Sequence, residues 1–268
     1  MLNNSQKILK EARRQHYAVG QFNVFNLETA RAVIKAAEKL KAPVIIGVSP
    51  KTIEYAGLNQ ITSIIKTEAS GTKNPVVLHL DHSFDFGLIK KAVSAGFTSV
   101  MFDGSKVNLA ENLKITQKTV NLCRPKNISV EAEIGVIGGK LTEPEEAAIF
   151  AQKTKANSLA ISIGNVHGGQ FAAEKLDLKL LQNIAQSVKI PLVLHGASST
   201  PRHEIKRAIK FGIVKINIDT DLRTAFRKGI LKYAAQEKDP RIILDNTAHE
   251  IQGVVEEKIK LFGSQNHA

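Results

Sequence analysis

The sequence is poor in the residues that build disulfide frameworks and large aromatic cores. Its 268 residues include one cysteine, Cys123, no tryptophan, and only 5% aromatic residues. A single thiol excludes both an internal disulfide and a zinc site made of several cysteines. Free cysteine without disulfides is typical of a reducing compartment, so we expect a cytoplasmic protein.

Long hydrophobic runs are missing as well. No stretch approaches the roughly 18 consecutive apolar residues of a membrane span, and the polar, basic start does not resemble a signal peptide. With 43% hydrophobic and 23% charged residues, the chain nevertheless has enough apolar material for a core. We expect a soluble protein without a membrane partner, in which residues 1–268 form one domain.

Acidic residues are fewer than basic ones, 25 against 37, and the formal charge is +12. A nucleic-acid-binding surface would concentrate basic residues in one stripe with interleaved aromatics. Here the lysines are spread over nearly every expected helix and aromatics are scarce. The distribution argues against nucleic acid and indicates either a solubilising surface or attraction for small anions.

Short β-branched runs alternate with longer amphipathic segments along the whole chain. We expect strands at 17–24, 43–48, 76–81, 99–103, 128–134, 158–163, 191–195 and 214–218. We expect helices at 27–40, 61–68, 86–94, 109–123, 143–154, 178–188, 201–211, 222–235 and 251–261. Eight apolar strands, each followed by a helix, imply a closed parallel sheet covered on the outside.

The pattern therefore predicts an α/β fold, a (β/α)8 TIM barrel with an N-terminal helix and a C-terminal helical extension. The alternative is an open, doubly wound sheet. That fold would be expected to carry a glycine-rich phosphate turn after its first strand, where this chain has Asn-Val-Phe-Asn at 23–26.

Polar residues end most of the expected strands, and in such barrels catalytic groups lie at the C-terminal strand ends. They are Asp81, His82, Asp103, Glu131, Glu133, His167, His195, Asn217 and Asp219. Three of the eight histidines follow strands three, six and seven, whose ends converge on one mouth. Three imidazoles with an open fourth position suit a catalytic zinc ion, so we predict metal ligands at His82, His167 and His195. The other five histidines are interpreted as structural or solvated.

Small residues and hydroxyls follow the same strand ends. Glycines follow His167, Gly-Ala-Ser-Ser follows His195, and Asn-Ile-Asp-Thr ends strand eight. Such loops expose backbone N–H groups, and barrels frequently bind phosphate after strands seven and eight. Glycine is also the ordinary turn residue, so the alternative is that these loops are only tight turns.

Seven strings along the chain carry a family resemblance. They are Phe-Asn-Val-Phe-Asn-Leu-Glu-Thr at 22–29, Leu-His-Leu-Asp-His at 78–82, Ser-Val-Met-Phe-Asp-Gly-Ser at 99–105, Val-Glu-Ala-Glu-Ile-Gly at 130–135, His-Gly-Ala-Ser-Ser at 195–199, Asn-Ile-Asp-Thr-Asp-Leu-Arg at 217–223 and Phe-Gly-Ser at 262–264. In their order they resemble the class II, metal-dependent ketose-bisphosphate aldolases. The resemblance implies a zinc enzyme of glycolysis that cleaves fructose 1,6-bisphosphate, or its tagatose epimer, into glycerone phosphate and glyceraldehyde 3-phosphate.

The resemblance also implies a role for each matching residue. His82, His167 and His195 match the zinc ligands, Asp81 matches the carboxylate that removes the C4 hydroxyl proton, and Glu133 matches an acidic residue that orients the metal. The donor phosphate would be bound by Gly168, Gly196, Ser198, Asn217, Asp219 and Thr220. The far phosphate would be bound by Ser49, Arg223, Asp239 and Arg241.

In the family the counterpart of Arg241 comes from a neighbouring subunit, which implies a homodimer or homotetramer. The resemblance also allows a monovalent cation near the donor phosphate. Asp219 and Arg223 make strand eight more similar to the fructose enzymes than to the tagatose enzymes. One geometric question is open: Asp81 and His82 are neighbours on one strand, and both reach the mouth only if the strand ends between them.

The sequence departs from the family after Gly139, where the family carries an acidic mobile loop whose glutamate exchanges a proton of the donor half. Here Lys140 and Leu141 lead directly into the next helix, and Phe171 replaces a lysine often found in the family. Three hypotheses follow. The protein is an active aldolase in which Glu143 or a water transfers this proton, a weakened paralogue that binds sugar phosphates, or a barrel hydrolase using zinc-activated water.

Overall fold

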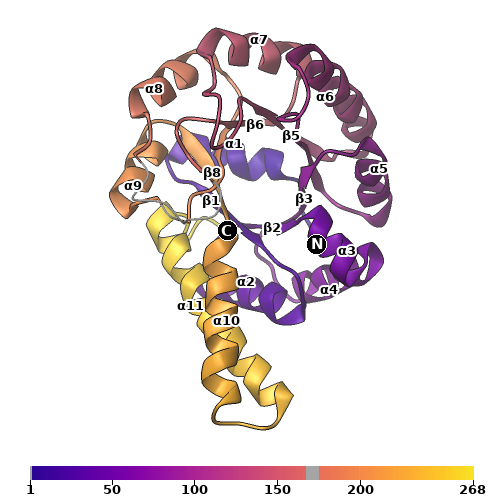
Figure 1. Ribbon diagram of the computed structural model, residues 1–268, viewed down its shortest axis with the longest axis vertical. Helices are drawn as coiled ribbons and strands as arrows, with labels where there is room; N and C mark the ends of the chain where they lie inside the picture. Colours follow the sequence, from indigo (N-terminus) through magenta and orange to yellow (C-terminus); the bar gives the residue numbers. More distant parts are fainter. Residues whose placement is uncertain (1, 167–174, 199) are drawn as a thin grey trace.

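The computed structural model describes residues 2–166, 175–198 and 200–268. Its centre is a closed barrel of eight parallel strands in sequence order, in which β1 pairs with both β2 and β8 (Figure 1). The strands are β1 (Val19–Asn23), β2 (Val44–Val48), β3 (Val76–Ser83), β4 (Ser99–Phe102), β5 (Ser129–Ile134), β6 (Ser158–Ile161), β7 (Leu192–Leu194) and β8 (Ile213–Ile218). The predicted TIM barrel is confirmed.

Helices surround the barrel, as expected for parallel strands buried on both faces. They are α1 (Ser5–Gln15), α2 (Leu27–Leu40), α3 (Pro50–Ala56), α4 (Leu58–Ser70), α5 (Phe86–Ala95), α6 (Leu109–Cys123) with the 3-10 turn η1 (Arg124–Lys126), α7 (Pro144–Thr154), α8 (Leu178–Ser187), α9 (Arg202–Lys210), α10 (Thr220–Ala234) and α11 (Pro240–Phe262). Within the described part of the chain, no helix is long and apolar enough to cross a membrane.

Two helices differ from the sequence-based expectation. Helix α3 was missed, although Ser49 caps it and Pro50 occupies its first turn, a favourable helix start. Helix α11 begins at Pro240, eleven residues before the expected start at 251, because Asp239 caps its N-terminus. Both errors come from following apolar periodicity and overlooking capping residues.

The barrel interior is layered. At its N-terminal end Val19, Ile45 and Val77 pack with Leu9 of α1, which therefore covers that end of the barrel. Met101, Ala160 and Val193 form a second apolar cluster inside the barrel. Polar side chains fill the remainder toward the C-terminal strand ends, where functional groups of TIM barrels lie.

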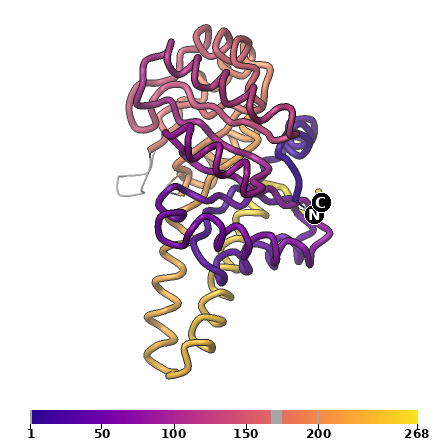
Figure 2. The backbone as a smooth tube through the Cα atoms, turned by 90° about the vertical axis from the view of Figure 1, so that its right-hand side faces the viewer, coloured from indigo at the N-terminus to yellow at the C-terminus, as the bar shows by residue number. Residues whose placement is uncertain are grey.

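Helices α10 and α11 form a hairpin that extends well beyond the barrel (Figures 1 and 2). The two helices pack closely against each other, and α11 also packs against α2 and β1. Leu231 and Ile242 on this hairpin are largely exposed. Asp239 and Arg241 lie at the start of α11, close to the turn of the hairpin.

Candidate active site at the barrel mouth

Asp81 and His82 both line one pocket at the mouth, although they are neighbours on β3. We expected the strand to end between these two residues. Instead, it runs on to Ser83. His82 has a φ of +52°, and the pairing of β3 with β4 shifts register between Leu80 and Ser83. An irregularity of this kind re-aims a side chain, so two consecutive residues reach the same side of the strand.

The imidazoles of His82 and His195 face each other across the mouth. His82 Nε2 and His195 Nδ1 are 2.8 Å apart, and the two rings are nearly perpendicular. Burial lowers the pKa of His82, but Asp81 and Asp103 raise it, with a net value of about 9. Burial lowers the pKa of His195. These pKa shifts favour a proton on His82 over one on His195.

Each of these imidazoles is held from behind by a carboxylate. His82 Nδ1 lies 2.7 Å from Oδ2 of Asp103, and His195 Nε2 lies 2.9 Å from Oε1 of Glu131. A carboxylate that accepts from one ring nitrogen fixes the tautomer and turns the opposite nitrogen toward a shared point. The positions of Asp103 and Glu131 at strand ends are visible in the sequence, but their contacts with the two imidazoles are not.

Glu131 is itself paired with a buried lysine that the sequence analysis missed. Lys215 Nζ lies 2.8 Å from Oε2 of Glu131 and 2.9 Å from Oδ1 of Asn217, and only 1% of Lys215 is exposed. Burial alone would raise the pKa of Glu131, but Lys215 and His195 lower it well below its usual range. The sequence contains one signal for this pair. Lys215 is the single charged residue in the apolar run of β8, and a buried charge needs a partner.

Glu133 supplies a third carboxylate next to the imidazoles. Its Oε2 lies 3.9 Å from Nδ1 of both His82 and His195, and that buried oxygen accepts no hydrogen bond from the described residues. Burial, together with the charge of Asp103, raises the pKa of Glu133 to about 8. Two imidazoles beside a buried carboxylate oxygen without a hydrogen bond form a set of metal ligands that suits a divalent ion such as zinc.

The ligand atoms of Asp81, His82 and His195 lie within 4.8 Å of one another, as do those of His82, Asp103 and Glu133. The predicted ligand His167 and the predicted phosphate-binding residue Gly168 lie outside the described residues, as does Phe171.

The carboxylate of Asp81 is fixed by two side-chain amides. Its Oδ2 accepts from Asn23 at 2.7 Å, and its Oδ1 accepts from Asn217 at 3.2 Å. Burial would raise the pKa of Asp81, but His82 and His195 hold it well below its usual range, so the carboxylate is ionised. Asn23 is placed by Gly47 on β2, where an added Cβ would lie 2.2 Å from the Asn23 amide oxygen.

The pocket that contains Asp81 has a volume of about 210 Å³. Its described lining residues are Asn23, Asp81, His82, Gly196, Ser198, Asn217, Asp219, Thr220 and Arg223. Helix α10 begins at Thr220, so the positive end of its dipole lies at this pocket. Gly196 has a φ of +67°, a left-handed conformation that glycine adopts without strain. This side of the mouth is suited to an anionic group.

Comparison with known proteins decides the family. The model of a family described as "Fructose-bisphosphate aldolase class-II" matches residues 3–267. The chain belongs to the class II fructose-bisphosphate aldolase family. This aldolase is therefore a lyase, and the resemblance seen in the sequence is confirmed.

Similar proteins carry related descriptions. The aldolase is 39% identical to the 6-phospho-5-dehydro-2-deoxy-D-gluconate aldolase of Shouchella clausii, over 97% of this chain and 94% of that protein. The solved YdjI aldolase from Escherichia coli K12 has a TM-score of 0.94, 34% identity and full coverage of both chains. Fructose-bisphosphate aldolase from Campylobacter jejuni has a TM-score of 0.88 and 26% identity, over 100% of this chain and 97% of that one.

The aldolase has a second pocket beside the first, and His82 lines both. This pocket has a volume of about 320 Å³ and is lined by His82, Phe84, Asp103, Ser105, Glu133, Val136 and Ile137. Val136 and Ile137 belong to the short connection between β5 and α7. The mouth therefore offers space in two pockets that both contact His82.

The connection after β5 is a closed turn in this aldolase. Val136 N donates to Lys140 O at 2.8 Å, and Thr142 Oγ1 donates to Ile134 O at 2.7 Å. Glu143 is exposed, occupies the N-cap of α7 and lines neither pocket. The geometry therefore gives no support to Glu143 as the residue that replaces the loop glutamate.

Three residues predicted for the far phosphate lie away from both pockets. Ser49 caps α3, where its Oγ accepts from Thr52 N at 3.2 Å. Arg241 is largely exposed on the protruding hairpin, where its guanidinium lies 2.6 Å from the carboxylate of Asp239. Within one chain, only Arg223 of this predicted group lines the pocket.

Proposed function

We propose that this protein is a zinc-dependent aldolase that reversibly splits a phosphorylated ketose into glycerone phosphate and an aldehyde. The observation that carries the proposal is the facing pair His82 and His195, each backed by a carboxylate, next to the ionised Asp81. Two imidazoles oriented in this way favour metal binding, and Asp81 lies beside them as a group that can transfer a proton. The zinc ligands would be His82, His195 and His167.

The bound metal would act as a Lewis acid toward the substrate carbonyl, stabilising the negative charge that develops when the carbon–carbon bond breaks. Glu133 would orient the metal. Glu131 and Asp103 would keep the two imidazoles in the tautomers that direct Nδ1 of His195 and Nε2 of His82 toward it.

Asp81 would be the base for cleavage. It takes the proton of the hydroxyl on the carbon that becomes the aldehyde, and the electron pair of the broken carbon–carbon bond passes to the carbon next to the carbonyl. In the reverse direction Asp81 returns the proton. Asn23 and Asn217 hold both carboxylate oxygens, which reduces the reorganisation needed during the transfer.

The donor phosphate would lie against Gly196, Ser198, Asn217, Asp219 and Thr220, with Gly168 on the same side. The N-terminus of α10 supports this placement, because backbone N–H groups and the helix dipole favour an anion. A monovalent cation would lie near this phosphate site.

Two kinds of substrate, a ketose bisphosphate and a phosphorylated keto acid, are consistent with this chemistry. Fructose 1,6-bisphosphate is the substrate expected from the sequence, with its tagatose epimer as a variant. The relative from Shouchella clausii supports 6-phospho-5-dehydro-2-deoxy-D-gluconate. In both cases the same retro-aldol cleavage releases glycerone phosphate, while the aldehyde carries a phosphate in the first case and a carboxylate in the second.

The test is an assay that follows glycerone phosphate release from these three compounds, with and without a chelator. Turnover that is lost on chelation and restored by zinc supports the proposal, and the relative kcat/KM values identify the substrate. Tight binding without turnover would favour a weakened sugar-phosphate-binding paralogue. Phosphate release without carbon–carbon cleavage would favour a hydrolase.

We also propose that the protein is a homodimer or homotetramer. The protruding hairpin carries exposed apolar residues, Leu231 and Ile242, and Arg241 at the start of α11 lines neither pocket at the mouth. A neighbouring subunit's Arg241 could complete a far-phosphate site that also contains Ser49 and Arg223. Sedimentation of the purified protein tests this assembly.

A further inference from the structure

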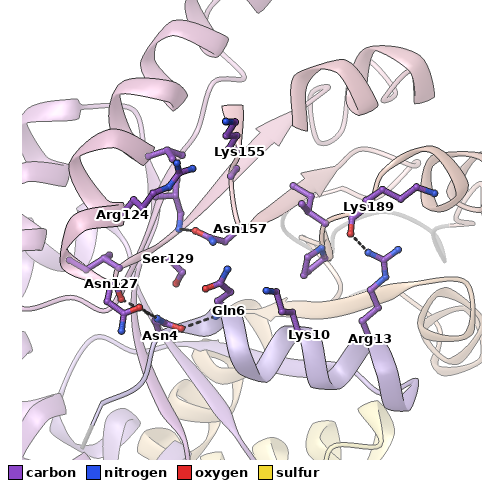
Figure 3. Close-up of a pocket in the computed structure, with 16 residues that line it drawn as sticks. Asn4, Gln6, Lys10, Arg13, Arg124, Asn127, Ser129, Lys155, Asn157 and Lys189 are labelled. Atoms are coloured by element: carbon purple, nitrogen blue, oxygen red, sulfur yellow. Dashed lines mark hydrogen bonds between the residues drawn. The ribbon is translucent and has the colours of Figure 1, made fainter. Parts of the chain in front are cut away.

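The end of the barrel opposite the mouth contains a cavity of about 610 Å³ that the aldolase reaction does not use. It lies between α1, which covers the N-terminal end of the barrel, and the segments that precede β5, β6 and β7 (Figure 3). Pockets for small molecules have volumes of roughly 300–1,000 Å³, so the space is sufficient for an organic ligand.

The cavity is lined by five cationic side chains from four separate segments. Helix α1 supplies Lys10 and Arg13, which share one helix face with Gln6 because the three residues are spaced four and three apart. The other three cations are Arg124 on η1, Lys155 directly after α7 and Lys189 before β7. Segments far apart in the sequence therefore bring positive charge to this cavity, although the ammonium of Lys189 is directed to the end of α8, where its Nζ donates to Gln186 O at 2.8 Å.

This positive charge is not neutralised by nearby acids. The described lining residues include no aspartate or glutamate, and none of the five cations forms an ion pair within the described part of the chain. The neutral polar lining residues are Asn4, Gln6, Asn127, Ser129 and Asn157. They can donate hydrogen bonds to an anion without opposing its charge.

The walls are held in place by hydrogen bonds. Asn4 Nδ2 donates to Asn127 Oδ1 at 2.8 Å, and Ser5 Oγ donates to Ser129 Oγ at 2.8 Å, which joins α1 to the start of β5. Arg13 donates to the backbone carbonyl of Lys189 on the other side of the cavity. A preformed site of this kind loses little entropy when it binds a ligand.

A structural explanation covers part of the cluster. Basic residues at helix C-termini stabilise the helix dipole, and Arg13, Arg124 and Lys155 occupy such positions. Lys10 lies in the middle of α1, so the dipole does not account for it. The dipole also does not account for a ligand-sized cavity whose described lining has five cations and no acid.

We propose that this cavity is a second ligand site, which binds a small organic molecule carrying a multiply charged phosphate group. Guanidinium groups match phosphate oxygens in a planar fork, and the cavity has two, from Arg13 and Arg124. Val120, Ile190 and Pro191 provide apolar wall for the organic part. The site does not depend on the metal, because the strand ends that carry His82 and His195 are at the other end of the barrel.

The test compares two double variants that each lose two positive charges, one on α1 and one on or directly after α7. Lys10→Gln/Lys155→Gln removes two cations of the cavity, whereas Lys7→Gln/Lys153→Gln removes exposed lysines of α1 and α7 that do not line it. Each purified protein is titrated calorimetrically with inorganic pyrophosphate, and with citrate as a carboxylate of similar charge. Aldolase activity and the unfolding midpoint of both variants serve as controls for folding.

We expect one pyrophosphate-binding event to be weakened about tenfold or more in the first variant and to be unchanged in the second. Added salt should weaken this same event. Equal pyrophosphate affinity in both variants and in the parent protein would overturn the proposal, because all binding would then be elsewhere. Citrate binding as tightly as pyrophosphate would overturn the assignment to phosphate. If the first variant fails to fold, Arg124→Gln/Lys189→Gln provides the same comparison.

Discussion

His82 Nε2 lies 2.8 Å from His195 Nδ1, although 113 residues separate the two histidines in the sequence. Each ring is oriented by a carboxylate, His82 by Asp103 directly after β4 and His195 by Glu131 on β5. The arrangement brings two imidazole nitrogens to one point, beside the buried carboxylates of Glu133 and Asp81.

Replacing His195 with alanine should remove most of the bound metal together with the activity, because one imidazole donor is lost from the centre of the site. Metal analysis of the purified variant, alongside the aldolase assay, measures both effects. His203→Ala is the control, since His203 is exposed on α9. Stoichiometric zinc in His195→Ala would contradict the assignment of this residue as a ligand.

Asp81→Ala should leave the metal content near normal and lower cleavage by about 10²–10⁴, because general-base help contributes rate and not metal affinity. The comparison of metal content with kcat separates the two roles. Asn23→Ala should give a smaller loss of kcat, since it removes only one of two amides that hold the Asp81 carboxylate. An unchanged rate in Asp81→Ala would show that this carboxylate is structural.

Lys215→Met should destabilise the fold by about 3–5 kcal/mol, because Glu131 would lose its buried charge partner. The free energy of unfolding in denaturant measures this loss. Lys215→Met combined with Glu131→Gln should recover much of the stability, since no uncompensated charge remains buried. If Lys215→Met unfolds at the same denaturant concentration as the parent protein, the ion pair does not support the site as described.

The short connection after β5 leads to a prediction about the donor half of the substrate. Grafting a glutamate-containing loop between Gly139 and Thr142 should increase the rate of tritium exchange from glycerone phosphate, because the family places a glutamate there for this proton. A graft with glutamine in its place is the matched control. If the parent protein already exchanges this proton faster than it cleaves a bisphosphate, another group performs the transfer. Glu143→Gln then tests that residue directly.

The sequence by itself determined the barrel and most residue types of the mouth. Strand and helix periodicities are local properties, so eight alternating units could be read without knowing any long-range contact. The strand ends also identified Asp81, His82 and His195, because parallel strands of a barrel end at the same rim. Capping at Ser49 and Asp239 was equally local, and attention to it would have found α3 and the full length of α11.

Only the tertiary structure decided how these groups meet. The left-handed conformation of His82 depends on the register between β3 and β4, which no spacing in the sequence reports. The pairing of Lys215 with Glu131 joins β8 to β5 across the barrel interior. The basic cavity likewise collects five cations from four segments, each of which looks like an ordinary solvated lysine or arginine in the sequence. These contacts depend on register and closure of the sheet, which are properties of the whole barrel and not of any segment.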